Sequence, residues 1–229
     1  MDTRLPRVYV VRHGATPWTR SKRHTGRTDL PLLPEGEVEA AALAHRLVGI
    51  DYMLVLRSPL VRAVQTCQLA GFGSRAEDDP DLMEWDFGLY EGLTTTEIRE
   101  QRPGWYLLRD GCPDGETPEE VGERADRVIA RVRAARGNSL LFSHSGFSRV
   151  LAARWLGLPA SRARFVDLSN AALSVLGYDD IRAGPVLLPW HYLTKPASSS
   201  LPDAAGRLYP GASTNPLTQR VEDRPSDHR

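Results

Sequence analysis

Short apolar runs alternate with segments of helical periodicity along this 229-residue chain, and the alternation restricts the fold more than any other feature. Five runs have the length and composition of buried strands: residues 8–11, 53–56, 140–142, 173–178 and 186–188. Helical patterns lie between them, at residues 34–48, 58–70 and 145–156. Strands that alternate with helices are typical of a sheet covered on both faces. We therefore predict an α/β fold of three layers, α/β/α, with a mostly parallel central sheet.

Residue types at the helix starts support these assignments. A serine and a proline at 58–59 are expected to open one helix. The serine hydroxyl can accept a backbone N–H of the first turn, and proline has no N–H at a position where an N–H would find no partner within the helix. Two capping boxes, Thr94 with Glu97 and Thr117 with Glu120, predict two more helices.

Two predicted helices carry a recognisable apolar side. In the helix at 34–48 the apolar residues are Val38, Ala41, Ala42 and Leu47. In the helix after Thr117 they are Val121, Ala125, Val128, Ile129 and Val132. Charged residues lie opposite this second stripe: Arg124, Asp126, Arg127 and Arg131. We expect the stripes to face the core and the charges to face away from it.

Composition changes near the C-terminus. From Lys195 onward the chain has several prolines, a triple serine, few large apolar residues and no periodicity. Such a segment cannot bury enough apolar surface to offset the entropy of ordering it. We predict one domain over residues 1–194 and a disordered or loosely attached tail over residues 195–229.

The cysteines and the N-terminal residues favour a cytoplasmic location. Cys67 and Cys112 form no CxxC pair, so we expect free thiols in a reducing compartment. The apolar run near the N-terminus is too short for a signal peptide or for a membrane span. We expect no membrane association. The sequence does not specify an oligomeric state, and a homodimer is one arrangement that it allows.

The charge balance argues against a protein that binds nucleic acid. Lys plus Arg and Asp plus Glu both number 29, whereas binding by counterion release requires a basic domain. All the cations except Lys22 and Lys195 are arginines. Base composition of the genome can explain that excess, so each arginine is judged by its position. Any anion site in this chain would be built from guanidinium groups.

Two histidines follow apolar runs in the same arrangement. His13 and Gly14 come directly after the run at 8–11, and His144 with Gly146 follows the run at 140–142. Open α/β sheets bind ligands beyond the carboxyl ends of their strands. We therefore expect the two imidazoles to lie in one crevice.

Arginines and an acid accompany these histidines. Arg12 precedes His13, and Arg62 lies one turn into the helix that follows the second strand. Glu84 stands among large apolar residues, which would favour its protonated form. Asp86 is the rival acid, and in an extended segment it would share a face with Glu84. The combination of two histidines, two arginines and one half-buried acid indicates phosphate chemistry.

The residue types suggest how phosphate would be handled. Arginines bind phosphoryl oxygens through forked hydrogen bonds, and their field should keep His13 neutral and nucleophilic. A neutral imidazole can attack phosphorus and form a phosphohistidine. Arg12, Arg62 and His144 are suited to hold the phosphoryl group. Glu84 can give a proton to the leaving oxygen and later take one from water.

These residues lie in motifs that resemble the histidine phosphatase superfamily, also called phosphoglycerate-mutase-like. The resemblance covers about residues 7–180. Its motifs are VRHGATPW, HTGRTDLPLLPEG, RSPLVRAVQT, LMEWDFGLYEG and SHSGFSRVLAARW. It implies the phosphoglycerate-mutase-like fold, with His13 as the nucleophile, Glu84 as the proton donor and Arg12, Arg62 and His144 as the phosphate pocket. Family members need no metal or other cofactor, in agreement with the lack of metal-binding motifs here.

The loop that follows the first predicted strand, over residues 12–29 (the first loop), contains further candidates for substrate binding: Thr19, His24, Thr25 and Gly26. Many family members have asparagine and glutamine where this chain has Thr19 and Thr25, and threonine can still donate to a phosphate. His24 is equally consistent with loop packing. The basic run of Arg20, Lys22, Arg23 and Arg27 is consistent with a solvated face or with a second phosphate site. Three aromatic residues lie in the segment over residues 84–117 (the middle segment), and they are consistent with a pocket wall or with the apolar core: Trp85, Trp105 and Tyr106.

Within the family, the middle segment looks most like small broad-specificity phosphatases and fungal-type sedoheptulose-1,7-bisphosphatases. Phosphoglycerate mutases carry a long insertion there, whereas only about 25 residues separate Glu91 from Glu116 in this chain. Without that insertion the site should stay open, so that water can reach and hydrolyse a phosphohistidine. We therefore expect a metal-independent phosphomonoesterase acting on a small phosphorylated metabolite. The alternatives are phosphoglycerate mutase activity and a non-catalytic module that binds phosphorylated ligands.

Overall fold

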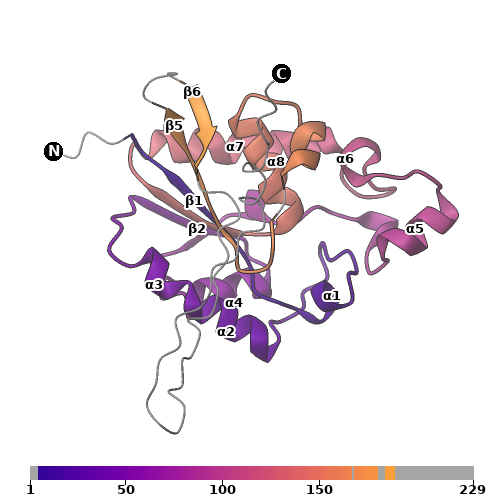
Figure 1. The fold of residues 1–229 in the computed structure, drawn as a ribbon, viewed down its shortest axis with the longest axis horizontal. Helices are drawn as coiled ribbons and strands as arrows, with labels where there is room; N and C mark the ends of the chain where they lie inside the picture. The colour runs from indigo at the N-terminus through magenta and orange to yellow at the C-terminus, as the bar shows by residue number, and fades with distance from the viewer. Residues whose placement is uncertain (1–4, 167, 180–183, 189–229) are drawn as a thin grey trace, which may run out of the picture. The chain divides into compact units, whose positions relative to one another are not determined.

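A computed structural model describes residues 5–166, 168–179 and 184–188. Within them one sheet has the strand order β3-β2-β4-β1-β5-β6 (Figure 1). Its strands are β1 (Val8–Arg12), β2 (Leu54–Arg57), β3 (Glu77–Asp78), β4 (Ser139–Ser143), β5 (Leu173–Asp179) and β6 (Gly184–Leu187). The first four run parallel, and β5 and β6 are antiparallel to their neighbours. The prediction of a mostly parallel sheet is confirmed.

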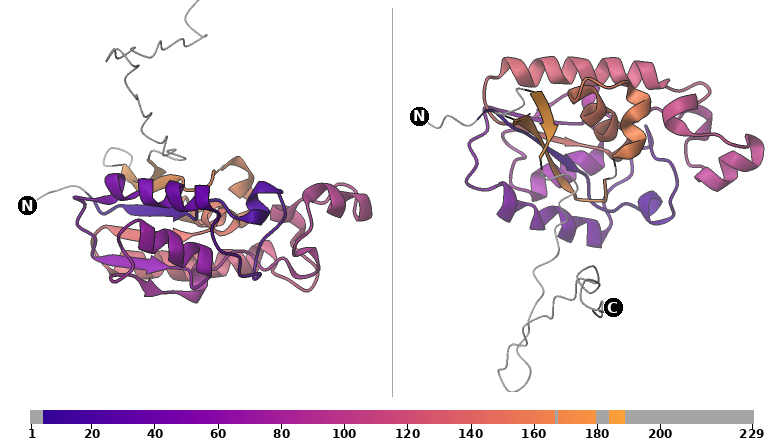
Figure 2. Two further views of the ribbon diagram at one scale, coloured as in Figure 1. Left: turned by 90° about the horizontal axis from the view of Figure 1, so that it is seen from below. Right: turned by 45° about the horizontal axis from the view of Figure 1, so that its top comes forward.

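Helices cover both faces of this sheet (Figures 1 and 2). The α-helices are α1 (Pro17–Arg20), α2 (Pro34–Ala42), α3 (Ala44–Leu47), α4 (Val61–Leu69), α5 (Thr95–Gln101), α6 (Leu107–Asp110), α7 (Pro118–Ala134) and α8 (Ser145–Trp155). Three short 3₁₀ helices are η1 (Pro80–Leu82), η2 (Gly88–Tyr90) and η3 (Ala160–Phe165). No helix among these described residues is long and apolar enough to cross a membrane. The predicted tail over residues 195–229 lies outside the described residues.

Alternate side chains of the strands enter two separate cores. Val10, Leu56 and Leu141 pack with the apolar residues of α7 and α8. Val11 and Phe142, from the same strands, pack with the side chains of α3 and α4. Because successive strand residues point to opposite faces, continuous apolar runs such as residues 140–142 produce a sheet that is buried on both sides. The three-layer α/β/α prediction is confirmed.

The expected helix at 34–48 differs from the prediction in two respects. It divides into α2 and α3 at Leu43, and its buried face consists of Gly36, Ala40, Leu43 and Leu47. Val38, which we expected in the core, is 65% exposed. The segment is helical and rich in apolar residues, as predicted, but α2 is rotated so that its small residues Gly36 and Ala40 are buried.

Ser58 was expected to cap a helix, and this expectation is wrong. The chain bends at Pro59 and Leu60, and α4 begins at Val61 with Leu60 as its N-cap. Ser58 is completely buried, and its hydroxyl faces inward, toward the end of β4. The two capping boxes are confirmed. The hydroxyl groups of Thr94 and Thr117 each accept the backbone N–H of the third helical residue, and the backbone N–H groups of the two threonines donate to the carboxylates of Glu97 and Glu120.

The apolar stripe of α7 is confirmed, but one of the charges opposite it is not where we expected. All five predicted stripe residues are buried. Arg124 is buried as well, with 8% of its surface exposed, and it points toward the segment around Glu84. A long arginine side chain can enter the protein where carbonyl and carboxylate oxygens replace its hydration.

Two glycines allow the first loop to approach α2 closely. A Cβ atom at Gly36 would lie 2.2 Å from the carbonyl oxygen of Ala15, and a Cβ atom at Gly14 would lie 2.2 Å from the carbonyl oxygen of Gly36. Hydrogen bonds hold the contact, because the N–H of Ala15 donates to Glu39 and the N–H of Leu33 donates to Ala15. This contact fixes the chain immediately after His13.

We expect Gly36→Ala to destabilise the protein, because the added methyl group would have to displace the backbone of the first loop. The expected loss is about 1–3 kcal/mol in the free energy of unfolding, measured by urea denaturation. Gly122→Ala is the matched control: it lies within α7, where a Cβ would meet its nearest neighbour at 3.6 Å. That substitution should be neutral or stabilise by up to about 1 kcal/mol. Equal losses in both variants would contradict the close-approach argument.

Candidate active site

His13 lies directly beyond the carboxyl end of β1 and is 4% exposed. Its backbone N–H donates to Ser143, and its carbonyl accepts from Ala171, so the main chain on both sides is fixed. Ring atom Nδ1 lies 2.8 Å from the carbonyl oxygen of Gly14. A carbonyl can only accept, so Nδ1 carries the proton and Nε2 keeps its lone pair.

The charge environment also keeps His13 neutral. Burial lowers its pKa well below the usual value, and the positive charges of Arg62 and Arg12 lower it further. The hydrogen bond to Gly14 opposes this effect. At neutral pH the ring is therefore an uncharged imidazole with an available lone pair on Nε2.

His144 follows β4 and is completely buried, and its ring centroid lies 5.1 Å from that of His13. Nε of Arg62 donates to its Nδ1 at 3.1 Å. The proton of the neutral ring is therefore on Nε2, which donates to the hydroxyl of Ser58 at 2.7 Å. Burial, followed by the charge of Arg62, lowers the pKa of His144 well below the usual value. The two adjacent imidazoles are thus neutral and carry their protons on different nitrogens.

The guanidinium of Arg62 is completely buried between His144 and the first loop. Nη1 donates to the carbonyl of Thr28, and Nη2 donates to the carbonyls of Thr25 and Gly26 at 3.2 and 2.8 Å. Arg12 is half-buried, and its Nη1 donates to the carbonyl of Leu168 at 2.5 Å. Both arginines are close enough to His13 to lower its pKa.

Glu84 is 6% exposed, and its carboxylate accepts three backbone hydrogen bonds. The donors are the N–H groups of Trp85, Gly146 and Phe147, at 2.9 to 3.0 Å. Two of them belong to the first turn of α8, where the helix dipole also favours negative charge. We expected apolar neighbours to favour the protonated acid. In the structure three backbone N–H groups contact this carboxylate, a feature that its neighbours in sequence did not indicate.

Arg124 holds the main chain around Glu84 in place. Its Nη1 donates to the carbonyls of Asp81 and Met83 at 2.8 and 2.9 Å, and its Nη2 lies 3.4 Å from the carbonyl of Glu84. The same guanidinium forms a two-point ion pair with Glu116 at 2.6 and 2.8 Å. It also lies 5.1 Å over the ring of Phe147, whose N–H binds the Glu84 carboxylate.

Asp86, the rival of Glu84, faces elsewhere. One carboxylate oxygen accepts from the N–H of Gly88 at 3.0 Å, and the other lies 3.4 Å from Nε of Arg27. The backbone N–H of Asp86 donates to Glu116. Within the described part of the chain these contacts of the Asp86 carboxylate do not include Glu84, so Asp86 shapes the loop and does not support the acid directly.

The candidates of the first loop make contacts within the protein. The hydroxyl of Thr19 completes a capping box with Thr16, and that of Thr25 donates to the carbonyl of Arg23. The N–H of Gly26 donates to Glu91 at 2.9 Å. Of these residues, Thr25 and Gly26 lie beside Arg62, and the assignment of all of them to substrate binding stays a prediction.

His24 packs between aromatic rings. Its ring centroid is 4.7 Å from that of Phe87 and 5.5 Å from that of Trp105, and Nε2 lies 3.2 Å from the hydroxyl of Thr95. Burial lowers its pKa to about 4. Trp85 and Trp105 are also buried, so the core reading fits both of these tryptophans.

Carboxylates partner three members of the basic run. Arg20 pairs with Glu35, Arg23 with Glu97 and Arg27 with Asp86. Lys22 is exposed and has a φ of 58°. A second phosphate in this loop would have to compete with those carboxylates. No group of three or more His, Cys, Asp or Glu side chains in the described ranges is arranged to hold a metal ion.

Two contributors to the site were missed in the sequence. Ser58 was assigned to a helix cap, and Arg124 to the outer side of α7. The apolar stripe gave no indication that Arg124 turns inward. For Ser58, its place at the end of the second predicted strand was the only available signal.

Known proteins share both the sequence and the fold. The sequence model of the histidine phosphatase superfamily (branch 1) matches residues 8–190. An acid phosphatase of Mycobacterium tuberculosis is 37% identical over 184 residues, which cover 78% of this chain and 90% of that protein. The sedoheptulose 1,7-bisphosphatase of Saccharomyces cerevisiae is 32% identical over 212 residues, covering 79% and 78%. A solved structure from an open reading frame of M. tuberculosis has a TM-score of 0.79 at 33% identity, covering 82% of this chain and 98% of that chain.

We expect Arg124→Met to lower kcat by roughly 10²-fold with little change in KM for p-nitrophenyl phosphate, because it releases the main chain of Glu84 and leaves the side chains predicted to bind phosphate in place. Arg124→Lys should recover only part of kcat, since lysine cannot form the fork. Circular dichroism and urea unfolding report whether each variant is folded.

Arg127→Met provides the control for this prediction. Arg127 lies on the same helix and binds the Asp81 side chain at the exposed surface, at 2.7 and 2.8 Å. We expect kcat to change less than twofold. If KM rose and kcat did not fall in a folded Arg124→Met variant, the positioning role would be wrong.

The packing of His24 predicts a pH-dependent stability. Its folded pKa is about 4, below the unfolded value of 6.5, so the unfolded chain binds the proton first and stability falls as the pH drops from 6.5 toward 4. In His24→Gln the loss of unfolding free energy between pH 7 and pH 4 should be smaller by up to about 3 kcal/mol. Denaturant unfolding at both pH values measures it. His45→Gln, at an exposed position, should behave like the parent; an identical loss in all three proteins would refute this role of His24.

Proposed function

The chain belongs to the histidine phosphatase superfamily, and from that membership we propose that it hydrolyses small phosphorylated metabolites by way of a phosphohistidine on His13. Its relatives include phosphatases that are 37% and 32% identical to it. The observation that carries the proposal is the protonation state of His13. Its Nδ1–H is held by Gly14, which leaves the Nε2 lone pair available beside His144.

In the first step Nε2 of His13 attacks phosphorus. An N–P bond forms while the P–O bond of the ester breaks, and the electron pair of that bond leaves with the oxygen. In this proposal Arg12, Arg62 and His144 stabilise the charge on the equatorial oxygens. The phosphorylated ring keeps its Nδ1–H bond to Gly14, so it does not have to rotate during the transfer.

Glu84 supplies the proton that the leaving oxygen needs. Its carboxyl group accepts three backbone N–H bonds, and it has to carry a proton when it acts as an acid. A monoanionic phosphate ester brings such a proton into the site. After the transfer Glu84 is again a carboxylate, which is the form that the next step requires.

In the second step water attacks the phosphoryl group. The N–P bond breaks, its electron pair returns to Nε2 of His13, and Glu84 accepts the proton of the water. The segment between Glu91 and Glu116 contains the two short helices α5 and α6. It lacks the long insertion expected of a mutase, which favours hydrolysis over transfer to a second substrate.

Further expectations complete this proposal. We propose a domain over residues 1–194, a location in the cytoplasm and no interaction with nucleic acid. A homodimer is a further hypothesis, and size-exclusion chromatography with light scattering would test it. Thr19, His24, Thr25 and Gly26 are proposed as the loop beside the substrate.

Hydrolysis of p-nitrophenyl phosphate should continue in excess EDTA and fall by about 10³-fold or more in His13→Ala, because the nucleophile is lost. Phosphohistidine is hydrolysed in acid and persists under alkaline conditions. The labelled phosphoenzyme of the wild-type protein should therefore be recovered under alkaline conditions. Glu84→Gln should trap more label than the wild type, because it slows the attack of water. Activity that EDTA abolishes, or that survives in His13→Ala, would falsify the mechanism.

The mutase alternative makes a different prediction. We expect release of phosphate from phosphorylated metabolites to exceed interconversion of 2- and 3-phosphoglycerate. Comparing kcat/KM across a panel of sugar phosphates and phosphorylated acids also identifies the preferred substrate class. Interconversion that is faster than phosphate release would establish the mutase, and binding of the whole panel without turnover would establish a non-catalytic module.

A further inference from the structure

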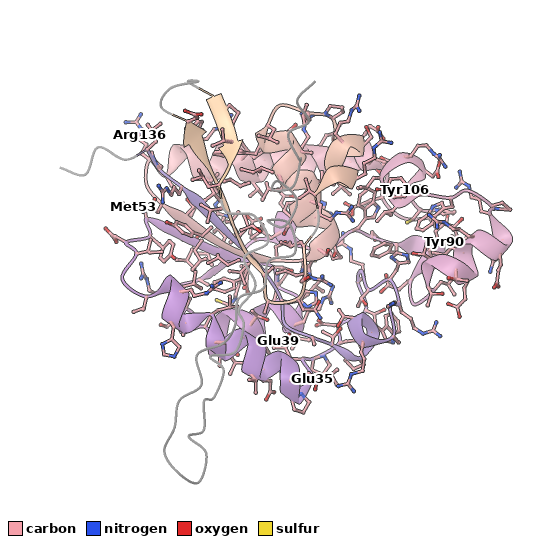
Figure 3. The ribbon with its side chains drawn as sticks, viewed as in Figure 1. Glu35, Glu39, Met53, Tyr90, Tyr106 and Arg136 are labelled. Carbon is pink, nitrogen blue, oxygen red and sulfur yellow. The ribbon has the colours of Figure 1, made fainter. Side chains whose placement is uncertain are left out.

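The peptide group between Gly14 and Ala15 contacts the proposed nucleophile on one side and α2 on the other. Its carbonyl oxygen lies 2.8 Å from Nδ1 of His13, and its N–H donates to Oε2 of Glu39 at 2.9 Å. Glu39 is a half-buried residue of α2, and Figure 3 shows it on this helix together with Glu35. One planar amide therefore joins a carboxyl group to the ring that the proposed mechanism uses.

Glycine makes the orientation of this amide dependent on its partners. Because Gly14 has no Cβ atom, the peptide group that follows it can rotate about the backbone bonds at little steric cost. The preceding peptide group is held separately. The N–H of Gly14 donates to the hydroxyl of Thr66 at 3.2 Å, and that hydroxyl donates to the carbonyl of Arg62 at 2.7 Å. The hydrogen bond to Glu39 restrains the rotation that remains.

The position of α2 brings Glu39 to this amide. Gly36 lies one turn earlier on the same helix, and residues three apart share a helix face. A Cβ atom at Gly36 would lie 2.7 Å from the backbone nitrogen of Ala15, so the glycine allows the helix to come this close. The N–H of Leu33 binds the carbonyl of Ala15, which belongs to the next peptide group and does not orient the Gly14 carbonyl directly.

The carbonyl that Glu39 orients determines which nitrogen of His13 is available. A proton on Nδ1 leaves the lone pair on Nε2, the attacking atom of the proposed first step. If the amide turned, Nδ1 would lose its acceptor, and a proton that moved to Nε2 would block the attack. An acceptor on the N–H of Ala15 also polarises the amide, which strengthens the Gly14 carbonyl as an acceptor.

We propose that Glu39 is a positioning residue for the reaction: it holds the Gly14 carbonyl against Nδ1 of His13 and so keeps Nε2 available to attack phosphorus. This inference rests on the proposed function, because it takes His13 as the nucleophile. Glu39 acts through one peptide group and has no contact with the substrate in this proposal.

Substitutions at Glu39 separate the hydrogen bond from the space that the side chain fills. Methionine has no oxygen to accept the Ala15 N–H, whereas glutamine has an amide oxygen. For p-nitrophenyl phosphate, kcat/KM should fall roughly tenfold or more in Glu39→Met and less than threefold in Glu39→Gln. Glu39→Asp, whose shorter side chain withdraws the carboxyl group, should also lose activity. The inhibition constant of inorganic phosphate, which reports the predicted phosphate pocket, should change less than twofold in each variant.

Nitrogen NMR of protein labelled at the histidine nitrogens reads the ring of His13 directly. Its signals are assigned by their loss in His13→Ala. In the wild-type protein Nδ1 should carry the proton, whereas in Glu39→Met part of the population should carry it on Nε2. This measurement needs no turnover. It therefore decides the role of Glu39 even if the protein hydrolyses no phosphate ester, a result that would contradict the proposed function alone.

Glu35→Met is the matched control. Glu35 is an exposed residue of the same helix and pairs with Arg20, so this variant removes a carboxyl group without changing the partners of the amide. Its kcat/KM and its His13 signals should match those of the wild type. An unchanged His13 spectrum in Glu39→Met that urea unfolding shows to be folded would overturn the proposal. A loss of kcat/KM in Glu35→Met or Glu39→Gln as large as that in Glu39→Met would overturn it too.

Discussion

The completely buried guanidinium of Arg62 is the constraint on which the candidate site depends. A buried charge without partners is strongly destabilising, so the structure must supply acceptors around it. Three carbonyls of the first loop and the imidazole of His144 do so. The same interactions fold the first loop over α4 and determine which nitrogen of His144 carries its proton. The positive charge also helps to keep His13 neutral.

The sheet brings these groups together. β1, β4 and β2 are parallel neighbours, so His13, His144 and Ser58 follow three adjacent strand ends. A shared edge, and not closeness in sequence, places the two rings 5.1 Å apart. The close contact between Gly14 and Gly36 then fixes the chain just after His13. Polar chemistry is therefore built at one edge of a sheet that is apolar on both faces.

Much of the fold and the candidate site could be predicted from the sequence. Apolar runs and capping boxes specify elements through local physics, and the position of His13 and His144 after two such runs indicated one crevice. What the sequence did not indicate were rotations and long-range partners. The exposed face of α2 and the inward turn of Arg124 depend on which neighbours each helix meets. Two of the three hydrogen bonds to Glu84 come from α8, more than 60 residues further along the chain, whereas its apolar neighbours in sequence suggested a different environment.

The attachment of Glu84 to α8 has a mechanical consequence. His144 occupies the position before the first turn of that helix, and the N–H groups of the same turn hold the carboxylate. A displacement of α8 would therefore move the histidine and the acid together, so the distance between them depends on the start of one helix.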